Sequence, residues 1–265
     1  MTKTLVSRRL IGWLLLPLLL LGAAGAWLAL DPGFRWGRPS SNIAADMPKD
    51  EFERRVRDYL TGHPEVVVQA ANQFEELQRA NEESEVRKIL QAHTDEVFRD
   101  PASPIGGNPN GEVTLIEFFD YNCPYCRQMV PVMIKAEEAD PQLRVVYKEF
   151  PILGPNSTFA ARAALAAHKQ AKYVAFHRAL YQVRGAVDPS KIMEAATAVG
   201  LDVERLKTDM EDPALKAAID KNLELAKVLR INGTPGFVVG DQILRGATDL
   251  KTLQAWVHAA RERRK

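Results

Sequence analysis

The sequence predicts an α/β fold in which a helical block separates two strand-containing halves, with a helical arm in front. Two apolar runs, 113–119 and 143–150, have strand character and flank a segment with helical spacing. Helical patterns then fill about 157–230. Two short runs around a glycine-aspartate pair at 240–241 indicate a hairpin, and a last helix covers 250–263. The predicted order is therefore β-α-β, helices, β-β-α.

Length and composition narrow the class of protein. The chain has 265 residues, which suits one or two domains, and 46% of them are hydrophobic. A formal net charge of +1 argues against a nucleic-acid partner, because such partners select strongly basic surfaces. The 2 cysteines exclude a disulfide scaffold. Two cysteines in one short loop suit redox chemistry or metal binding instead.

Residues 1–30 have the pattern of an export leader. Three basic residues precede an uncharged apolar run over 10–30. The small residues at 24–26 suit cleavage as a signal peptide, whereas the length of the run would also suit an anchor in the inner membrane. Both alternatives remain open. Either one places the rest of the chain in the periplasm or another extracytoplasmic space, where disulfides persist.

A linker at 31–48 leads to the helical arm, 49–100. The arm is predicted to contain one helix up to about Leu60, a break at 62–64 and a second helix to about Arg99. Its apolar stripe is too narrow for the arm to fold alone. The arm could dock on its own catalytic domain. Formation of a homo-oligomer is favoured, because several copies would bury the stripe together.

The catalytic domain is predicted to span 112–265, after an irregular lead-in at 101–111. The first strand runs from Val113 to Phe119, and the helix that follows begins at Cys123. Pro131 lies inside this helix and should kink it without ending it, because apolar spacing resumes afterwards. Strand 143–150 then completes a parallel βαβ unit.

The helical insertion, about 157–230, is divided by capping signals. Ser157 is predicted to cap its first helix, and helices should also begin after Asp188, Asp202 and Asp212. Asp249 should cap the closing helix of the domain.

Cys123 and Cys126 carry the predicted chemistry. A cysteine at a helix N-terminus meets unpaired N–H groups and the positive end of the dipole, which favour its thiolate. Cys123 is therefore expected to be the exposed nucleophile, and Cys126, one turn further, the buried resolving thiol. Exchange proceeds through a mixed disulfide and needs no cofactor beyond the cysteine pair. Pro124 and Tyr125 are expected to tune the redox behaviour of the pair.

Three segments carry a resemblance to a known family. EFFDYNCPYC at 117–126, KEFP at 148–151 and GTPGF at 233–237 are similar to motifs of the DsbA-like branch of the thioredoxin superfamily. The resemblance implies a thioredoxin fold, cysteine-containing protein substrates and a membrane partner that recycles the dithiol. The arm resembles the N-terminal region of the suppressor-of-copper-sensitivity subgroup, in which such arms can oligomerise.

The resemblance also implies roles for single residues. Pro235 would be cis, and its loop would face the dithiol and let the Thr234 backbone pair with an extended substrate. Glu117 would lie beneath Cys126 and relay its proton. From its place on the neighbouring strand, Lys148 is expected to pair with Glu117 and to contribute to redox tuning. This chain has Tyr125 where related oxidases often have histidine, which argues against a strongly oxidising potential.

The predicted function is that of an exported thiol–disulfide oxidoreductase that forms, reduces or isomerises disulfides. The arm and Thr234 favour an isomerase or reductase over an oxidase. The alternative is a copper chaperone that uses the same two thiolates, which suit Cu(I) but need further ligands from another chain. A structural module with an inert disulfide is disfavoured, because a helix N-terminus activates the thiol.

Overall fold

The computed structural model describes residues 47–263, so the leader and most of the linker lie outside the described residues. The chain divides into two compact units between Gln73 and Phe74. Within 47–263, no helix has the length and apolar character needed to cross a membrane. The apolar run at 10–30, for which cleavage and membrane anchoring are both kept as alternatives, lies outside that range.

The first unit contains helix α2 (Lys49–Gly62) and the start of α3 (Pro64–Ala92), separated at His63 as expected. No residue of α2 is buried. Its apolar stripe faces solvent, with Phe52 50% and Tyr59 56% exposed. The stripe continues onto α3, where further large apolar side chains are exposed: Val67, Val68, Phe74 and Leu77.

The end of α3 behaves differently, because it docks on the catalytic domain within the second unit. Leu90 is buried there, and the helix stops at Ala92 instead of continuing to Arg99. A short helix, α4 (Thr94–Phe98), follows and buries Val97 in the same apolar cluster as Ile116. Docking on the chain's own domain, one of the two alternatives for the arm, therefore holds for the C-terminal end of the arm.

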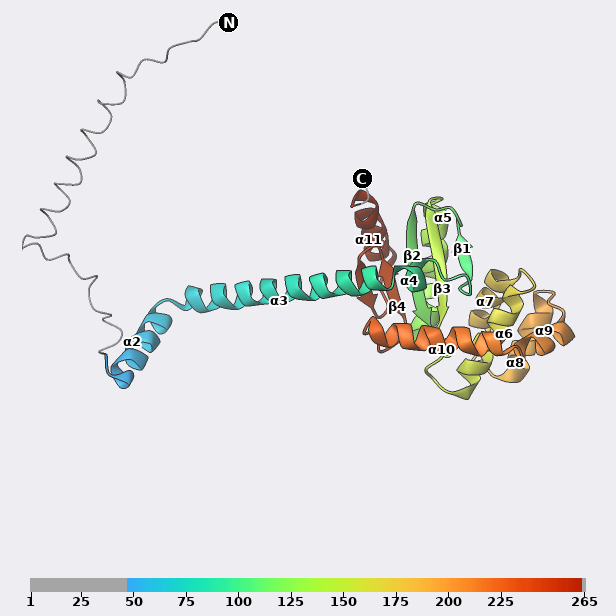
Figure 1. Ribbon diagram of the computed structural model, residues 1–265, viewed down its shortest axis with the longest axis horizontal. Helices are drawn as coiled ribbons and strands as arrows, with labels where there is room; N and C mark the ends of the chain where they lie inside the picture. Colours follow the sequence, from blue (N-terminus) through green and yellow to red (C-terminus); the bar gives the residue numbers. More distant parts are fainter. Residues whose placement is uncertain (1–46, 264–265) are drawn as a thin grey trace, which may run out of the picture. The chain divides into compact units, whose positions relative to one another are not determined.

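The second unit is built on a five-stranded sheet of order β1-β3-β2-β4-β5 (Figure 1). Strands β2 (Val113–Phe119) and β3 (Leu143–Glu149) are parallel, and the other neighbours are antiparallel. Strands β4 (Gly236–Val239) and β5 (Gln242–Arg245) form the predicted hairpin. Strand β1 (Ile105–Gly107) corrects the prediction of an irregular lead-in at 101–111. It has three residues, two of them glycine, and therefore no alternating pattern to reveal it.

Helices pack on both faces of this sheet. Helix α5 (Pro124–Ala139) follows β2 and continues through Pro131, and α11 (Leu250–Glu262) closes the chain. Between β3 and β4 lie five helices: α6 (Pro155–His168), α7 (Tyr173–Gln182), α8 (Pro189–Ala198), α9 (Val203–Met210) and α10 (Pro213–Val228). Helices α6 to α9 gather beside the sheet (Figure 1).

Most predicted helix caps are present. The side chains of Asp188, Asp202, Asp212 and Asp249 each accept a hydrogen bond from a backbone N–H of the helix that follows. Ser157 is an exception, because α6 already begins at Pro155. The Ser157 hydroxyl instead donates to the buried Asp120 carboxylate at 2.7 Å.

Alternation along β2 divides the core into two clusters. Leu115 and Phe119 belong to the cluster that contains Cys126, whereas Ile116 and Phe118 belong to the cluster that contains the end of α3 and part of α10. Because side chains alternate along a strand, Glu117 faces the same side as Leu115 and Phe119. The strand therefore points a carboxyl group toward the cysteine helix.

Candidate active site

The two cysteines lie where strand β2 passes into helix α5. Cys123 immediately precedes the helix, and Pro124 occupies its first position, where the missing N–H of proline costs no hydrogen bond. The Cys123 N–H donates to the Asp120 carbonyl at 3.1 Å. This turn fixes Cys123 at the helix end, where free N–H groups can stabilise a negative sulfur.

Cys123 is less accessible than the sequence suggested. Both thiols are free, and Cys123 is only 4% exposed, so the expectation of an exposed nucleophile is wrong for this structure. The reason is the loop that precedes β4. Its Thr234 carbonyl oxygen lies 3.3 Å from the Cys123 Sγ and accepts a hydrogen bond from it. Tyr125, between the cysteines, is exposed.

The loop over Cys123 contains a cis peptide bond between Thr234 and Pro235. The residue that follows strand β5 also holds this loop, because the Gly246 N–H donates to the Pro235 carbonyl at 2.8 Å. Thr234 and Pro235 thus stand opposite the cysteines, although they are more than 100 residues away along the chain.

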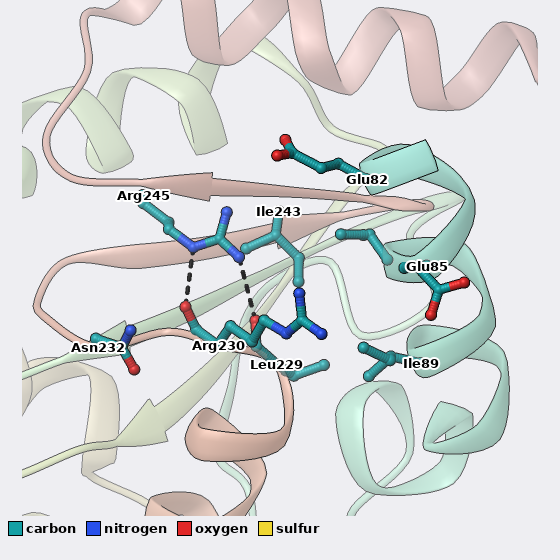
Figure 2. A pocket seen from close by; sticks show the side chains of 9 residues that line it. Glu82, Glu85, Ile89, Leu229, Arg230, Asn232, Ile243 and Arg245 are labelled. Atoms are coloured by element: carbon teal, nitrogen blue, oxygen red, sulfur yellow. Dashed lines mark hydrogen bonds between the residues drawn. The ribbon is translucent and has the colours of Figure 1, made fainter. Parts of the chain in front are cut away.

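Arg245 holds the segment that leads into this loop. Its guanidinium donates to the carbonyls of Arg230, at 2.9 Å, and Leu229, at 3.3 Å, at the end of α10 (Figure 2). These groups form part of the wall of a cavity of about 320 Å³ between α3 and β5. No sequence pattern singles out Arg245, because its contacts are made to backbone carbonyls.

Cys126 lies fully inside the core. Burial, the nearby Glu117 carboxyl and Cys123 raise the pKa of the Cys126 thiol well above its usual value. A thiolate released at this position would therefore take up a proton readily.

Glu117 is a buried acidic group whose charge acts on that thiol. It is 4% exposed, and burial together with the charge of Glu137 raises the pKa of its carboxyl to about 8. A carboxyl group with this pKa is largely protonated at neutral pH. The structure places Glu117 on the Cys126 side of the sheet.

Lys148 does not pair with Glu117, which corrects the sequence-based expectation. In the β2–β3 register Glu117 lies opposite Tyr147, and Lys148 lies opposite Phe118. Lys148 therefore points to the other face of the sheet. There its ammonium group donates to the Asp100 carboxylate at 3.1 Å and to the Glu96 carbonyl at 2.7 Å.

Asp120 is a structural residue of the site that the sequence did not single out. One of its carboxylate oxygens accepts the N–H groups of Ile152 and Leu153, each at 2.9 Å. The other accepts from the Asn122 N–H and the Ser157 hydroxyl. Asp120 thereby ties the loop after β3 to the cysteine turn.

Large apolar side chains near the site are either buried in the core or exposed at the surface. Phe119, Tyr121 and Phe237 are fully buried and belong to the core. The exposed apolar side chains are instead Tyr125, Ile152 and Leu153, on the cysteine turn and the loop that Asp120 holds beside it. The sequence signal that could have identified the loop with Ile152 and Leu153 is Asp120, because this residue lies within the motif at 117–126.

A second buried network lies behind the cysteine turn. The Glu149 carboxyl accepts hydrogen bonds from Tyr121, at 3.0 Å, and Tyr173, at 2.6 Å. The Tyr121 hydroxyl also lies 3.1 Å from His177 Nδ1. Burial lowers the pKa of His177 to about 3, so this ring is neutral at physiological pH.

Comparison with protein families agrees with this geometry. Residues 114–257, more than half of the chain, match the model of the DSBA-like thioredoxin domain. Residues 49–81 match the N-terminal domain of the copper resistance protein ScsC. The second match covers α2 and the part of α3 that carries the exposed apolar stripe.

Solved structures show the same similarity. A thioredoxin-like oxidoreductase from Silicibacter pomeroyi DSS-3 is 49% identical, with a TM-score of 0.62, over 63% of this chain and 97% of that one. ScsC from Proteus mirabilis in a transitional conformation is 31% identical, with a TM-score of 0.62, over 84% of this chain and all (100%) of that one. The thiol-disulfide exchange protein alpha-DsbA2 from Wolbachia pipientis is 27% identical, with a TM-score of 0.64, over 68% and 97% of the two chains.

The curated relatives are similar to this chain over a part of their own length. A Na(+)/H(+) antiporter NhaA from Herminiimonas arsenicoxydans is 30% identical over 171 residues, which are 62% of this chain and 27% of that protein. The chain thus spans about a quarter of the length of the curated relatives it matches. On the family match, the solved structures and the cysteine geometry, the chain belongs to the DsbA-like thioredoxin-domain family and carries an N-terminal region of the ScsC type.

Proposed function

We propose that this chain is an exported thiol–disulfide oxidoreductase that acts on cysteine-containing proteins. The observation that carries the proposal is the contact between Cys123, at the start of α5, and the Thr234 carbonyl on the opposing loop. This arrangement sets a thiol at a helix N-terminus against a backbone carbonyl with which an extended substrate could pair instead. The basic and then apolar start of the sequence supports export to the periplasm.

The oxidising direction begins with the Cys123–Cys126 disulfide. A substrate thiolate attacks the Cys123 sulfur, which forms a mixed disulfide and releases Cys126 as a thiolate. A second substrate thiolate then attacks the substrate sulfur of the mixed disulfide and releases Cys123. The substrate gains one disulfide, and the cysteine pair takes up two electrons. Reduction and isomerisation use the same steps from the dithiol, and a membrane redox partner restores the starting state.

Glu117 handles the proton of the buried thiol in this scheme. The released Cys126 thiolate takes the proton of the Glu117 carboxyl, and in the reverse direction the carboxylate removes it. The raised pKa of both groups supports this exchange, because each is disfavoured as an anion in the core.

Substrate binding would use the loop at Thr234 and the exposed apolar side chains beside it. An extended segment could pair with the Thr234 backbone as an added strand. Tyr125, Ile152 and Leu153 would contact its apolar side chains. These features suit unfolded or misfolded protein segments as substrates.

Whether the protein oxidises, reduces or isomerises disulfides depends on the reduction potential of the cysteine pair and on the oligomeric state of the chain. The exposed stripe of α2 and α3 supports a homo-oligomer, which would bring several cysteine pairs together and favour isomerisation or reduction. The reduction potential of the pair tests this choice. A value near −270 mV, about that of thioredoxin, fits a reductase or isomerase, whereas a value near −120 mV, about that of DsbA, fits an oxidase.

The exchange activity itself is tested with the full chain in insulin reduction and in the refolding of scrambled ribonuclease. Cys123→Ala should abolish turnover in both assays, because the attacking sulfur is lost. Full activity of this variant would overturn the proposal.

A copper-binding role for the same thiols is the second candidate, and the ScsC-type N-terminal match favours keeping it. Among residues 47–263, no cluster of three or more histidine, cysteine or acidic side chains forms a metal site. A closed site would therefore need ligands from a second chain. Sub-micromolar Cu(I) binding by a protein without exchange activity would support this candidate.

A further inference from the structure

A small polar cavity lies beside Glu117, between helix α5, strand β3 and helix α7. Its volume is about 10 Å³, and its polar lining consists of Glu117, Glu137, Tyr147, His177 and Arg178. This is about the space that one water molecule requires, and the lining offers it several hydrogen-bond partners. The Glu117 carboxyl itself has no side-chain hydrogen bond within the described part of the chain, so it is free to bond to a water there.

The cavity residues form a graded path from the core to the surface. Glu117 is 4% exposed, the Glu137 side chain is 10% exposed, and the Arg178 side chain is 38% exposed. The Arg178 guanidinium donates to one Glu137 carboxylate oxygen at 2.9 Å, and the Tyr147 hydroxyl donates to the other at 3.2 Å. The Glu137 carboxyl is thus fixed at the outer side of the cavity.

The charged and titratable groups around Glu117 differ in their fitness to carry a proton. His177 is neutral and already bonded to Tyr121. Burial raises the pKa of the Tyr147 hydroxyl above its usual value, and it also raises the pKa values of the nearby Tyr181 and Glu149. Burial raises the pKa of Glu137 as well, although Arg178 opposes this.

We propose that Glu137 carries the proton between the buried Glu117 carboxyl and solvent, through one water molecule in this cavity. The proposal rests on the proton exchange between Glu117 and Cys126 proposed above. After Glu117 has protonated the Cys126 thiolate, the Glu137 carboxylate takes up a proton from bulk water. Glu137 passes this proton to the cavity water as that water gives one of its own to the Glu117 carboxylate, so Glu137 ends as the carboxylate again. Only O–H bonds change, no electrons move, and the reverse reaction uses the same path.

The test compares Glu137→Gln with Glu138→Gln in the full-length chain. Glu138 is the next residue on the same helix and is exposed, so it serves as a matched control. Single-turnover rates are measured with a two-cysteine peptide in its reduced and its disulfide form, from pH 5 to 9, in H₂O and D₂O. General acid–base groups contribute about 10²-fold or more, so loss of an outer relay is expected to slow both directions at least about tenfold.

Three further results are expected of a relay. The equilibrium constant with the peptide stays within about twofold of that of the wild type, because both directions slow equally, and the solvent isotope effect increases. Glu138→Gln matches the wild type. Formate restores the rate of Glu137→Ala, since a small acid can occupy the space that the side chain leaves, whereas a variant that misfolds would not be rescued and would lose its far-ultraviolet circular dichroism.

Rates of Glu137→Gln within about twofold of the wild type at every pH would overturn the proposal. A parallel Glu117→Gln variant separates the proposed route through Glu137 from the proposed role of Glu117 itself. If Glu117→Gln is slow while Glu137→Gln is normal, only the route through Glu137 fails. If both are normal while Cys123→Ala is inactive, the role of Glu117 fails and exchange through the cysteine pair stands.

Discussion

The Sγ atom of Cys123 lies 3.3 Å from the carbonyl oxygen of Thr234 and donates a hydrogen bond to it. Only the thiol can make this bond, because a thiolate or a disulfide sulfur has no proton to donate. Ionisation of Cys123, or its bonding to a substrate, therefore releases the carbonyl. The same oxygen can then accept a hydrogen bond from the backbone of a substrate that lies along the loop.

The first prediction concerns the mixed disulfide at this position. Cys126→Ser should trap substrates on Cys123, because the serine hydroxyl does not attack the mixed disulfide. Incubation with a disulfide-containing peptide should give an adduct of the chain and one peptide strand by intact mass spectrometry. Cys123→Ser is the control and should give no adduct. Adducts on Cys126 in that control would reverse the roles of the two cysteines.

The second prediction is a pH dependence of stability that originates at Glu117. Its pKa is about 8 in the folded chain against a usual value of 4.5, so the folded state holds a proton that the unfolded state has lost between these values. The contribution of Glu117 to stability is therefore fully present below about pH 4.5 and decreases as the pH rises toward 8. A shift of this size corresponds to a few kcal/mol, as an order of magnitude.

Denaturant unfolding of the reduced protein between pH 4.5 and 8 measures this effect. Glu117→Gln should remove part of the decrease, because the amide does not titrate. The difference between the two proteins isolates Glu117 from Glu149, whose raised pKa acts in the same direction in both. Parallel curves for the wild type and Glu117→Gln would show that Glu117 is ionised or solvated in the folded chain.

The third prediction assigns Lys148 to stability and not to redox tuning. Lys148 and Asp100 form a buried ion pair, with side-chain exposures of 0% and 4%. Lys148→Met should lower the free energy of unfolding by about 3 kcal/mol, which is the lower end of the usual cost of breaking a buried ion pair. The lower end is expected because Asp100 keeps a contact with Lys221 at 3.6 Å. The reduction potential should not change, since the pair lies across the sheet from Glu117. A changed potential with unchanged stability would contradict this assignment.

The sequence predicted local features well and long-range contacts poorly. The bounds of β2, the hairpin of β4 and β5 around residues 240–241 and four aspartate caps follow from patterns within a few residues, and they match the structure. Strand β1, in contrast, exists through its pairing with β3, which no pattern within three residues could reveal. The partner of Lys148 depends on the β2–β3 register, and the burial of Cys123 depends on the distant Thr234. The catalytic roles of these residues stay predictions.

The fourth prediction tests Arg245 as a positioning residue for the loop that carries Thr234. Arg245→Ala removes both hydrogen bonds to the end of α10 (Figure 2). Each bond between a charged group and a carbonyl contributes about 1.5–3 kcal/mol when buried, and less here, because Arg245 is exposed. A rise in KM for peptide substrates of severalfold is expected, with little change in the potential. Arg230→Ala is the control, since the Arg230 side chain is exposed and makes no hydrogen bond within the described chain. Equal KM values for both variants would exclude a role of Arg245 in substrate positioning.

The last prediction concerns the apolar stripe of the arm. Phe52 and Tyr59 are exposed on α2, so their replacement should hardly affect a single folded chain. If copies of the chain assemble through this stripe, the double variant Phe52→Ser/Tyr59→Ser should lower the mass measured by light scattering, and Arg57→Ser, on the same helix, should not.

The position of the arm's docked end decides how a deletion should be designed. Leu90 and Val97 pack against the sheet beside Ile116. A deletion that extends to residue 100 would therefore uncover the core and cause aggregation for a reason unrelated to assembly. A deletion that stops at residue 78 removes the exposed stripe alone, and the shortened chain should stay folded and active on peptides. An unchanged mass for both this deletion and the double variant would mean that the stripe does not hold copies of the chain together.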